Sequence, residues 1–146
     1  MNENKEYFVK EDDFIVSKTD VKGKITYCNQ PFLEIVGATQ EQLLFKPHDI
    51  IRHPDMPRIV FKLLWDRIKA KQEVFAFVKN RSFDGGFYWV FANVTASLDA
   101  KGEIIGYHSV RRKPNANGVK FIEGVYKQLL DAEKSGGMKA SGKLLE

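Results

Sequence analysis

Arg52, His53 and Asp55 lie close together in the sequence. The long helix that is predicted at residues 58–70 begins directly after them. A guanidinium offers paired N–H donors to a phosphate group, and the N-terminus of a helix adds oriented backbone amides. This arrangement favours Arg52 as a phosphate ligand. The structural alternative is that Arg52 pairs with Asp55, which then also caps the helix near Arg58. His53 either hydrogen-bonds a ligand or orders the loop, and the same two interpretations apply to His48.

Asn80 lies near the end of a predicted strand, in which side chains alternate between two faces. Lys79 and Arg81 mark one face as solvated, so Asn80 belongs with Val74 and Val78 to the inner face. The same alternation on the next strand gives an inner face made of Tyr88, Val90, Ala92 and Val94. An amide at the edge of an apolar face needs a hydrogen-bond partner. That partner is either the polar edge of a bound ligand or the backbone.

The 3 histidines of the chain, His48, His53 and His108, are potential axial ligands for a haem iron. His108 shares one face of the last predicted strand with Gly106 and Val110, and this face points either into the core or outwards. The sequence contains no activated nucleophile motif, no set of metal ligands at fixed spacing and no Gly-rich phosphate loop. It therefore predicts neither an enzyme nor a metal site.

The elements that must position these residues follow from turn signals and hydrophobic periodicity. Strands are predicted at residues 14–19, 24–28, 73–82, 87–98 and 103–112. Asn29 is a plausible cap for a short helix that stops at Gly37, Thr39 begins a second short helix, and residues 58–70 form a long one. This order predicts an α+β fold with one five-stranded antiparallel sheet and the helices on a single face. A planar ligand would fit between the long helix and the sheet.

The chain divides into one folded domain with extensions at both ends. Residues 1–12 are an N-terminal extension, residues 13–113 the domain, residues 114–134 a C-terminal amphipathic helix, and residues 135–146 a flexible tail. Val119, Ile122, Tyr126 and Leu129 recur at helical spacing in the third segment. Gly and Ser residues weaken the helical pattern after residue 134.

Composition excludes several classes of protein. With 146 residues, 43% of them hydrophobic, the chain builds one core without a disulfide or metal. The net charge of +4 comes from dispersed basic residues, which argues against a nucleic-acid partner. The single cysteine, Cys28, favours a reducing, cytoplasmic compartment. No apolar run approaches the roughly 18 residues that span a bilayer, so we expect no direct membrane insertion.

Two sequence strings carry a resemblance to a known family. Residues 19–32 contain a D-x-x-G hairpin followed by N-x-x-F, and residues 46–57 read KPHDIIRHPDMP, with VKNR following at residues 78–81. These strings resemble the flavin-binding PAS domain of the bacterial aerotaxis and energy-taxis receptors. The resemblance extends from about Asp12 to Arg112, and it implies the PAS fold for the predicted domain.

The resemblance also implies non-covalent binding of flavin adenine dinucleotide (FAD). The residues that we expect around this cofactor are Arg52, His53, Asp55, Asn80, Trp65, His48, Asn29 and His108. In flavin-binding relatives an amide at the strand position of Asn80 binds the edge of the flavin ring. The chain departs from the receptors at Val74, where they carry a tryptophan that covers the flavin; Trp65 is the tryptophan expected nearby.

The function implied is that of a cytoplasmic redox or energy sensor, which relays the redox state of FAD to a separate transducer of the methyl-accepting type. The last helix and an exposed outer sheet face would carry this signal to the transducer or to a second copy in a homodimer. The aromatic residues of that face are Phe75, Phe77, Phe87, Trp89 and Phe91. The alternatives are a PAS interaction module that binds no cofactor, and a haem-based gas sensor.

Overall fold

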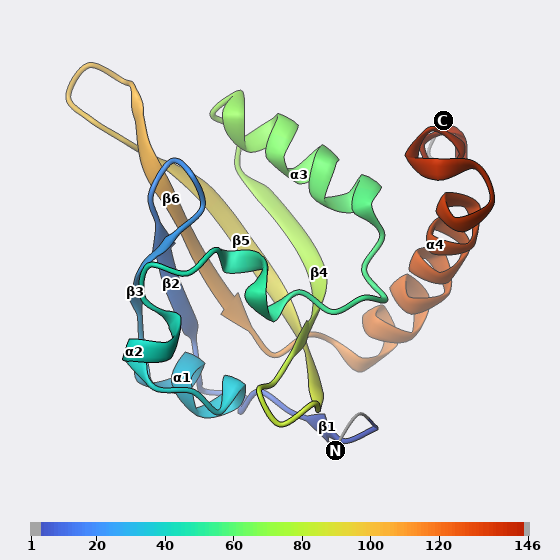
Figure 1. Ribbon diagram of the computed structural model, residues 1–146, viewed down its shortest axis with the longest axis horizontal. Helices are drawn as coiled ribbons and strands as arrows, with labels where there is room; N and C mark the ends of the chain where they lie inside the picture. Colours follow the sequence, from blue (N-terminus) through green and yellow to red (C-terminus); the bar gives the residue numbers. More distant parts are fainter. Residues whose placement is uncertain (1–3, 145–146) are drawn as a thin grey trace.

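The computed structural model describes residues 4–144 and shows one curved sheet with helices packed on both of its faces (Figure 1). The strands are β1 (Glu6–Tyr7), β2 (Ile15–Thr19), β3 (Ile25–Cys28), β4 (Val74–Arg81), β5 (Phe87–Leu98) and β6 (Ile104–Arg112). The helices are α1 (Gln30–Val36), α2 (Gln40–Leu43), the 3₁₀ helix η1 (His48–Ile51), α3 (Arg58–Lys69) and α4 (Ala116–Leu144). The five predicted strands and the α+β class are confirmed.

The sheet is antiparallel from β2 to β6, as predicted, with β3, β2, β6, β5 and β4 as neighbours in that order. A sixth strand, β1, pairs in parallel with the start of β5, so the sheet is mixed. These two residues were predicted only as part of the N-terminal extension, because a two-residue strand has no periodicity to detect. Gly106 keeps β6 close to β2, because a Cβ at this position would collide with the carbonyl oxygen of Thr19.

The two short helices begin at the caps that the sequence predicts. The Asn29 side chain accepts hydrogen bonds from the backbone amides of Phe32 (3.2 Å) and Val16 (3.1 Å) and donates one to the carbonyl of Phe14 (2.8 Å). It therefore caps α1 and also ties the helix to β2. Thr39 forms a capping box with Gln42 at the start of α2.

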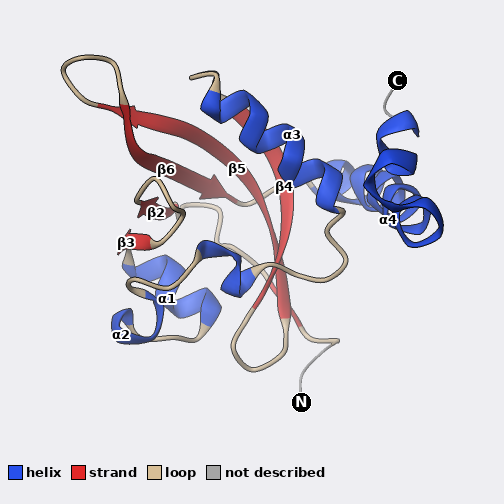
Figure 2. Ribbon diagram, turned by 45° about the horizontal axis from the view of Figure 1, so that its top comes forward, coloured by secondary structure: helices blue, strands red, loops and turns tan. Residues whose placement is uncertain are grey.

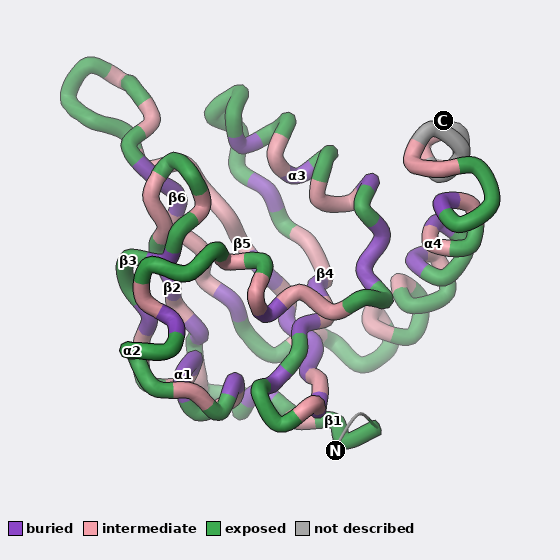
Figure 3. The backbone as a smooth tube through the Cα atoms, viewed as in Figure 1, coloured by how far each residue is buried: buried purple, intermediate pink, exposed green. Residues whose placement is uncertain are grey.

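The helices divide between the two faces of the sheet, as Figure 2 shows for α3 and α4. Helices α1, α2 and α3 lie on the inner face, which carries Val78 and Val90 of the main core cluster. Helix α4 packs on the outer face, where Tyr126 stacks on Trp89 with ring centroids 6.2 Å apart and its hydroxyl donates to the carbonyl of Phe77 (2.6 Å). Buried positions lie along the strands and on helices α1, α3 and α4 (Figure 3).

This packing corrects the prediction of an exposed aromatic outer face. Phe75 is exposed, but Trp89 is only 5% exposed because it lies beneath α4. Helix α4 is also longer than predicted: it continues beyond residue 134 to Leu144, with a break in helical geometry at Gly137. No helix within residues 4–144 is both long enough and apolar enough to cross a membrane.

The start of α3 is capped from a distance. Glu133 of α4 is buried, and its carboxylate accepts hydrogen bonds from the backbone amides of Arg58 and Ile59, both at 3.0 Å. A carboxylate at this place also compensates the positive end of the helix dipole. The predicted cap, Asp55, is instead 59% exposed and bonds to Lys79. The C-terminal helix therefore fixes the end of α3 directly.

Candidate functional site

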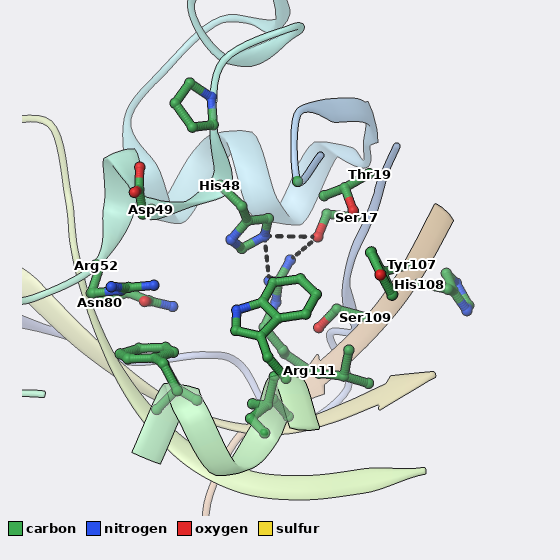
Figure 4. A pocket seen from close by; sticks show the side chains of 18 of the residues that line it. Ser17, Thr19, His48, Asp49, Arg52, Asn80, Tyr107, His108, Ser109 and Arg111 are labelled. Atoms are coloured by element: carbon green, nitrogen blue, oxygen red, sulfur yellow. Dashed lines mark hydrogen bonds between the residues drawn. The ribbon is translucent and has the colours of Figure 1, made fainter. Parts of the chain in front are cut away.

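A cavity of about 400 Å³ lies between α3 and the inner face of the sheet, at the place where the sequence predicts a ligand site. Helix α3 supplies its apolar wall, η1 and the segment after it supply one polar wall, and strands β2, β4, β5 and β6 form the floor (Figure 4). The apolar lining includes Phe61, Leu64, Trp65, Val78, Ala92 and Val94. The residues of β5 that face the cavity are small and leave space for it, as predicted from the alternation of side chains along the strand.

Arg52 and Asn80 form the polar group at the β4 end of the cavity (Figure 4). Their backbones meet in an isolated antiparallel bridge, and Asn80 is 4% exposed, so its predicted inward orientation is confirmed. The Arg52 guanidinium lies 3.7 Å from the centroid of the Phe61 ring. Its Nε is buried and has no hydrogen-bond partner among residues 4–144. Desolvation lowers the pKa of Arg52, and the nearby Asp49 opposes this shift.

A second polar group lies at the other end of the cavity and consists of Ser17, His48 and Arg111. The Arg111 guanidinium donates to Ser17 Oγ (2.8 Å) and contacts His48 Nε2 (3.1 Å), which also lies 3.1 Å from Ser17 Oγ. Arg111 is 3% exposed, and its guanidinium stacks 4.5 Å from the centroid of the Phe32 ring. Figure 4 shows the three polar side chains converging on one point.

His48 is held neutral by this environment. Desolvation and the positive charge of Arg111 lower the pKa of His48 to about 3. Because a guanidinium has only N–H donors, the contact with Arg111 makes Nε2 the acceptor and leaves the ring proton on Nδ1. The site therefore presents a neutral imidazole beside a cation.

Of the eight predicted site residues, the structure brings Arg52, Asn80, His48 and Trp65 to the cavity wall. Trp65 packs against Tyr107 in an edge-to-face contact with ring centroids 4.8 Å apart. His108 borders the cavity on β6, but its side chain points away from the polar groups (Figure 4). Residues 107, 109 and 111 of β6 face inwards instead, because each pairs with a residue of β5 that faces inwards.

The other three predicted residues do not line the cavity. His53 and Asp55 lie outside the cavity lining, and Asp55 bonds to Lys79 at 2.9 Å. This hydrogen bond lowers the pKa of Asp55. The predicted alternative, an ion pair between Arg52 and Asp55, is not formed. Asn29 is fully used as the helix cap described above and does not line the cavity.

Sequence reasoning missed Ser17 and Arg111 as site residues. Arg111 belongs to the basic run Arg111-Arg112-Lys113, which is typical of a solvated strand end. Strand alternation was the available signal: in such a run every second side chain turns inwards. Ser17 alternates with Val16 and Lys18 on β2 in the same way and is 1% exposed.

The lining of the cavity combines apolar and polar side chains. One wall is apolar and aromatic, and the polar groups at both ends are an amide, two guanidiniums, a hydroxyl and a neutral imidazole. Among the described residues no group of three or more His, Cys, Asp or Glu side chains is arranged to hold a metal ion. A planar, partly polar ligand with negative charge matches this lining.

Comparisons with known proteins agree with this description. The family model of the PAS fold matches residues 12–112. The aerotaxis receptor of Escherichia coli (strain K12) is 35% identical over 119 residues, covering 82% of this chain and 23% of the receptor. The nitrogen fixation regulatory protein of Klebsiella pneumoniae is 28% identical over 104 residues, covering 71% of this chain and 21% of that protein. The chain thus spans less than a quarter of these relatives.

Solved structures show the same fold. A light-oxygen-voltage domain studied with a flavin analogue superimposes with a TM-score of 0.67 at 18% identity, covering 74% of this chain and 82% of that one. The dark structure of the blue-light photoreceptor Aureochrome1 LOV gives 0.66 at 25% identity, covering 73% and 80%. The family match over residues 12–112 and the shared architecture show that the chain belongs to the PAS domain family.

Proposed function

We propose that this PAS domain binds FAD non-covalently in the cavity between α3 and the sheet, and that it reports the redox state of the flavin to a separate signal transducer. The observation that carries the proposal is the inward amide of Asn80, which is buried on the otherwise apolar inner face of β4. A flavin ring presents alternating donors and acceptors along one edge, which an amide matches with both of its groups.

The residues present fit a flavin in size and chemistry. The cavity volume of about 400 Å³ falls within the range of roughly 300–1,000 Å³ typical of small-molecule sites. Phe61 and Trp65 would lie against the ring, Asn80 would bind its edge, and Arg52 would bind phosphate. The buried, unpartnered Nε of Arg52 supports this last role, because buried donors normally have partners. When bound, the flavin would supply reversible electron transfer.

The route from the cavity to a partner runs through α3 and α4. Helix α3 lines the cavity with Phe61 and Trp65, and Glu133 of α4 caps its first turn. A small displacement of α3 therefore changes hydrogen bonds made by α4. A transducer that binds α4 would detect this change, which is the relay that we propose.

We also propose that this sensor is cytoplasmic and has no enzymatic activity. Electron exchange at a bound flavin requires no catalytic side chain. Cys28 is buried and free, which suits the reducing environment of the cytoplasm.

The test is the visible absorption spectrum of natively purified protein, followed by denaturation and identification of the released cofactor. We expect a structured flavin spectrum and release of FAD. Release of flavin mononucleotide would correct the cofactor, and a Soret band would replace the proposal with a haem sensor. A protein that remains colourless after incubation with FAD would contradict flavin binding and favour an interaction module.

Asn80→Ala tests the role of the amide. We expect at least tenfold weaker FAD binding or a shifted midpoint potential, because the ring edge loses its hydrogen-bond partner. The matched control is Asn93→Ala on the paired strand, whose side chain instead bonds to Glu73 at 2.8 Å. An unchanged spectrum, affinity and potential in Asn80→Ala would remove Asn80 from the site.

A further inference from the structure

Arg111 is a buried cation in the wall of the cavity. Its side chain contacts Ser17, His48 and the ring of Phe32, and it is 3% exposed. The guanidinium Nε is buried without a hydrogen-bond partner in the part of the chain that the structure describes. A guanidinium has five N–H donors, so these contacts leave it incompletely satisfied.

No negative charge in the described chain balances Arg111. The contact geometry makes His48 a neutral acceptor, and Ser17 is uncharged. Tyr88 of β5 and Cys28 of β3 are the acidic groups whose charge would act on Arg111, but burial raises the pKa of both. Both are therefore protonated at neutral pH. Within residues 4–144 no Asp or Glu side chain forms an ion pair with Arg111.

Burying an ion without a counter-ion is strongly unfavourable, and it lowers the pKa of Arg111 to about 10. A ligand that carries a negative charge would supply the missing counter-ion, and binding sites often reduce the stability of the ligand-free protein. Arg111 and Arg52 lie in different parts of the cavity wall. Arg111 lies on β6 between β2 and β5, whereas Arg52 is half-buried in the segment before α3.

We propose that Ser17, His48 and Arg111 form a recognition site for a negatively charged group in the buried part of the ligand. This inference rests on the proposed function for the identity of the ligand. With FAD, the ring is the part that enters the buried region, and two-electron reduction with uptake of one proton leaves one negative charge on it. The electrons come from a chemical reductant, dithionite in the test below. Arg111 thus favours the reduced ring over the oxidised one.

The first test measures unfolding of the ligand-free protein and does not depend on flavin. Arg111→Met retains much of the volume and removes the charge. We expect its urea midpoint to equal or exceed that of the wild type, because an uncompensated charge is lost. The matched control is Arg112→Met, which removes the neighbouring exposed charge on the same strand. A clearly lower midpoint in Arg111→Met alone would show that Arg111 serves the fold, and it would overturn the proposal.

The second test is a redox titration of the flavin-loaded protein with dithionite. Arg111→Met should lower the preference for reduced over oxidised flavin at least tenfold, which corresponds to about 30 mV in a two-electron midpoint potential. Arg111→Lys, which keeps the charge, should retain most of the wild-type potential. An unchanged potential combined with weaker binding of FAD, but not of riboflavin, would support the anion site and assign the charge to phosphate instead.

Unchanged potential and unchanged affinity in Arg111→Met would overturn the proposal. Failure of the anion-site proposal can be distinguished from failure of the proposed function. If the wild-type protein binds no flavin, the proposed function fails, while the ligand-free unfolding experiment still decides whether Arg111 is an uncompensated cation or a structural residue.

Discussion

The two faces of the sheet differ in what their polar and aromatic residues do. On the outer face, Trp89 and Phe77 are covered by α4 through the Tyr126 ring and hydroxyl, so apolar surface is buried and the backbone carbonyl is satisfied. On the inner face, Asn80 and Arg111 are just as deeply buried, but they border a cavity. One face is covered by α4, and the other borders the cavity in which we propose that a ligand binds.

This difference separates stability from binding. Burial of aromatic surface and satisfied hydrogen bonds stabilise the outer face. The inner face keeps polar groups that cost stability until a ligand meets them. Helix α3 connects the two, because it lines the cavity and is capped by Glu133 of the helix that covers the outer face.

The largest expected effect compares two tryptophans, one on each face. Trp89→Ala should destabilise the ligand-free protein by about 3–5 kcal/mol, because it removes a buried ring from a packed layer. Trp65→Ala should cost less, since Trp65 is half-buried beside the cavity, but should weaken flavin binding more. Urea unfolding and flavin titration of both variants provide the measurement. If Trp65→Ala were the more destabilising, the distinction between the faces would fail.

The next effect concerns the cap that joins the two layers. Glu133→Ala leaves the backbone amides of Arg58 and Ile59 without their acceptor and should cost about 1–3 kcal/mol. Glu133→Gln should cost less, because its carbonyl oxygen still accepts one hydrogen bond. Asp131→Ala, an exposed change on the same helix, is the control for lost charge. Equal stability of Glu133→Ala and Asp131→Ala in urea would show that the cap does not stabilise α3.

The smallest effect, taken over a single pH unit, is a pH dependence of the inner face. The pKa of His48 falls from 6.5 in the unfolded chain to about 3 in the folded one. Between these values the unfolded chain binds a proton that the folded protein does not, so stability decreases as pH falls, by at most about 1.4 kcal/mol per pH unit. His48→Gln should flatten the stability profile between about pH 7 and pH 5. The slope should change less in His108→Gln, because His108 points away from the polar groups of the cavity, although its pKa is lowered in the same direction. A wild-type slope in His48→Gln would contradict a neutral His48.

Local patterns were sufficient to predict most of the fold. The caps at Asn29 and Thr39 and the alternation that turns Asn80 inwards depend only on neighbouring residues. The orientation of β6 was less accessible, because both of its faces mix polar and apolar side chains. The alternation of side chains correctly placed His108 on one face with Gly106 and Val110, but it did not show whether this face points inwards. For the same reason Arg111 was interpreted as a surface charge.

Long-range contacts explain the other differences. Glu133 caps a helix that begins at Arg58, and no local sequence motif predicts a partner so distant in the sequence. Asp55 stood at the expected capping position, but Lys79 from β4 binds its carboxylate instead. The candidate site was therefore only half predictable: its β4 end follows from strand alternation and family resemblance, whereas its Arg111 end depends on tertiary packing.

The most direct test of the inner face as a binding site is urea unfolding of ligand-free protein at increasing concentrations of FAD. A ligand that binds only the folded state stabilises it by about 2.7 kcal/mol at a concentration of 100 times Kd. We expect the unfolding free energy to rise in proportion to the logarithm of the FAD concentration above Kd, and to rise less in Asn80→Ala. An unfolding curve that does not move at any FAD concentration would contradict the account.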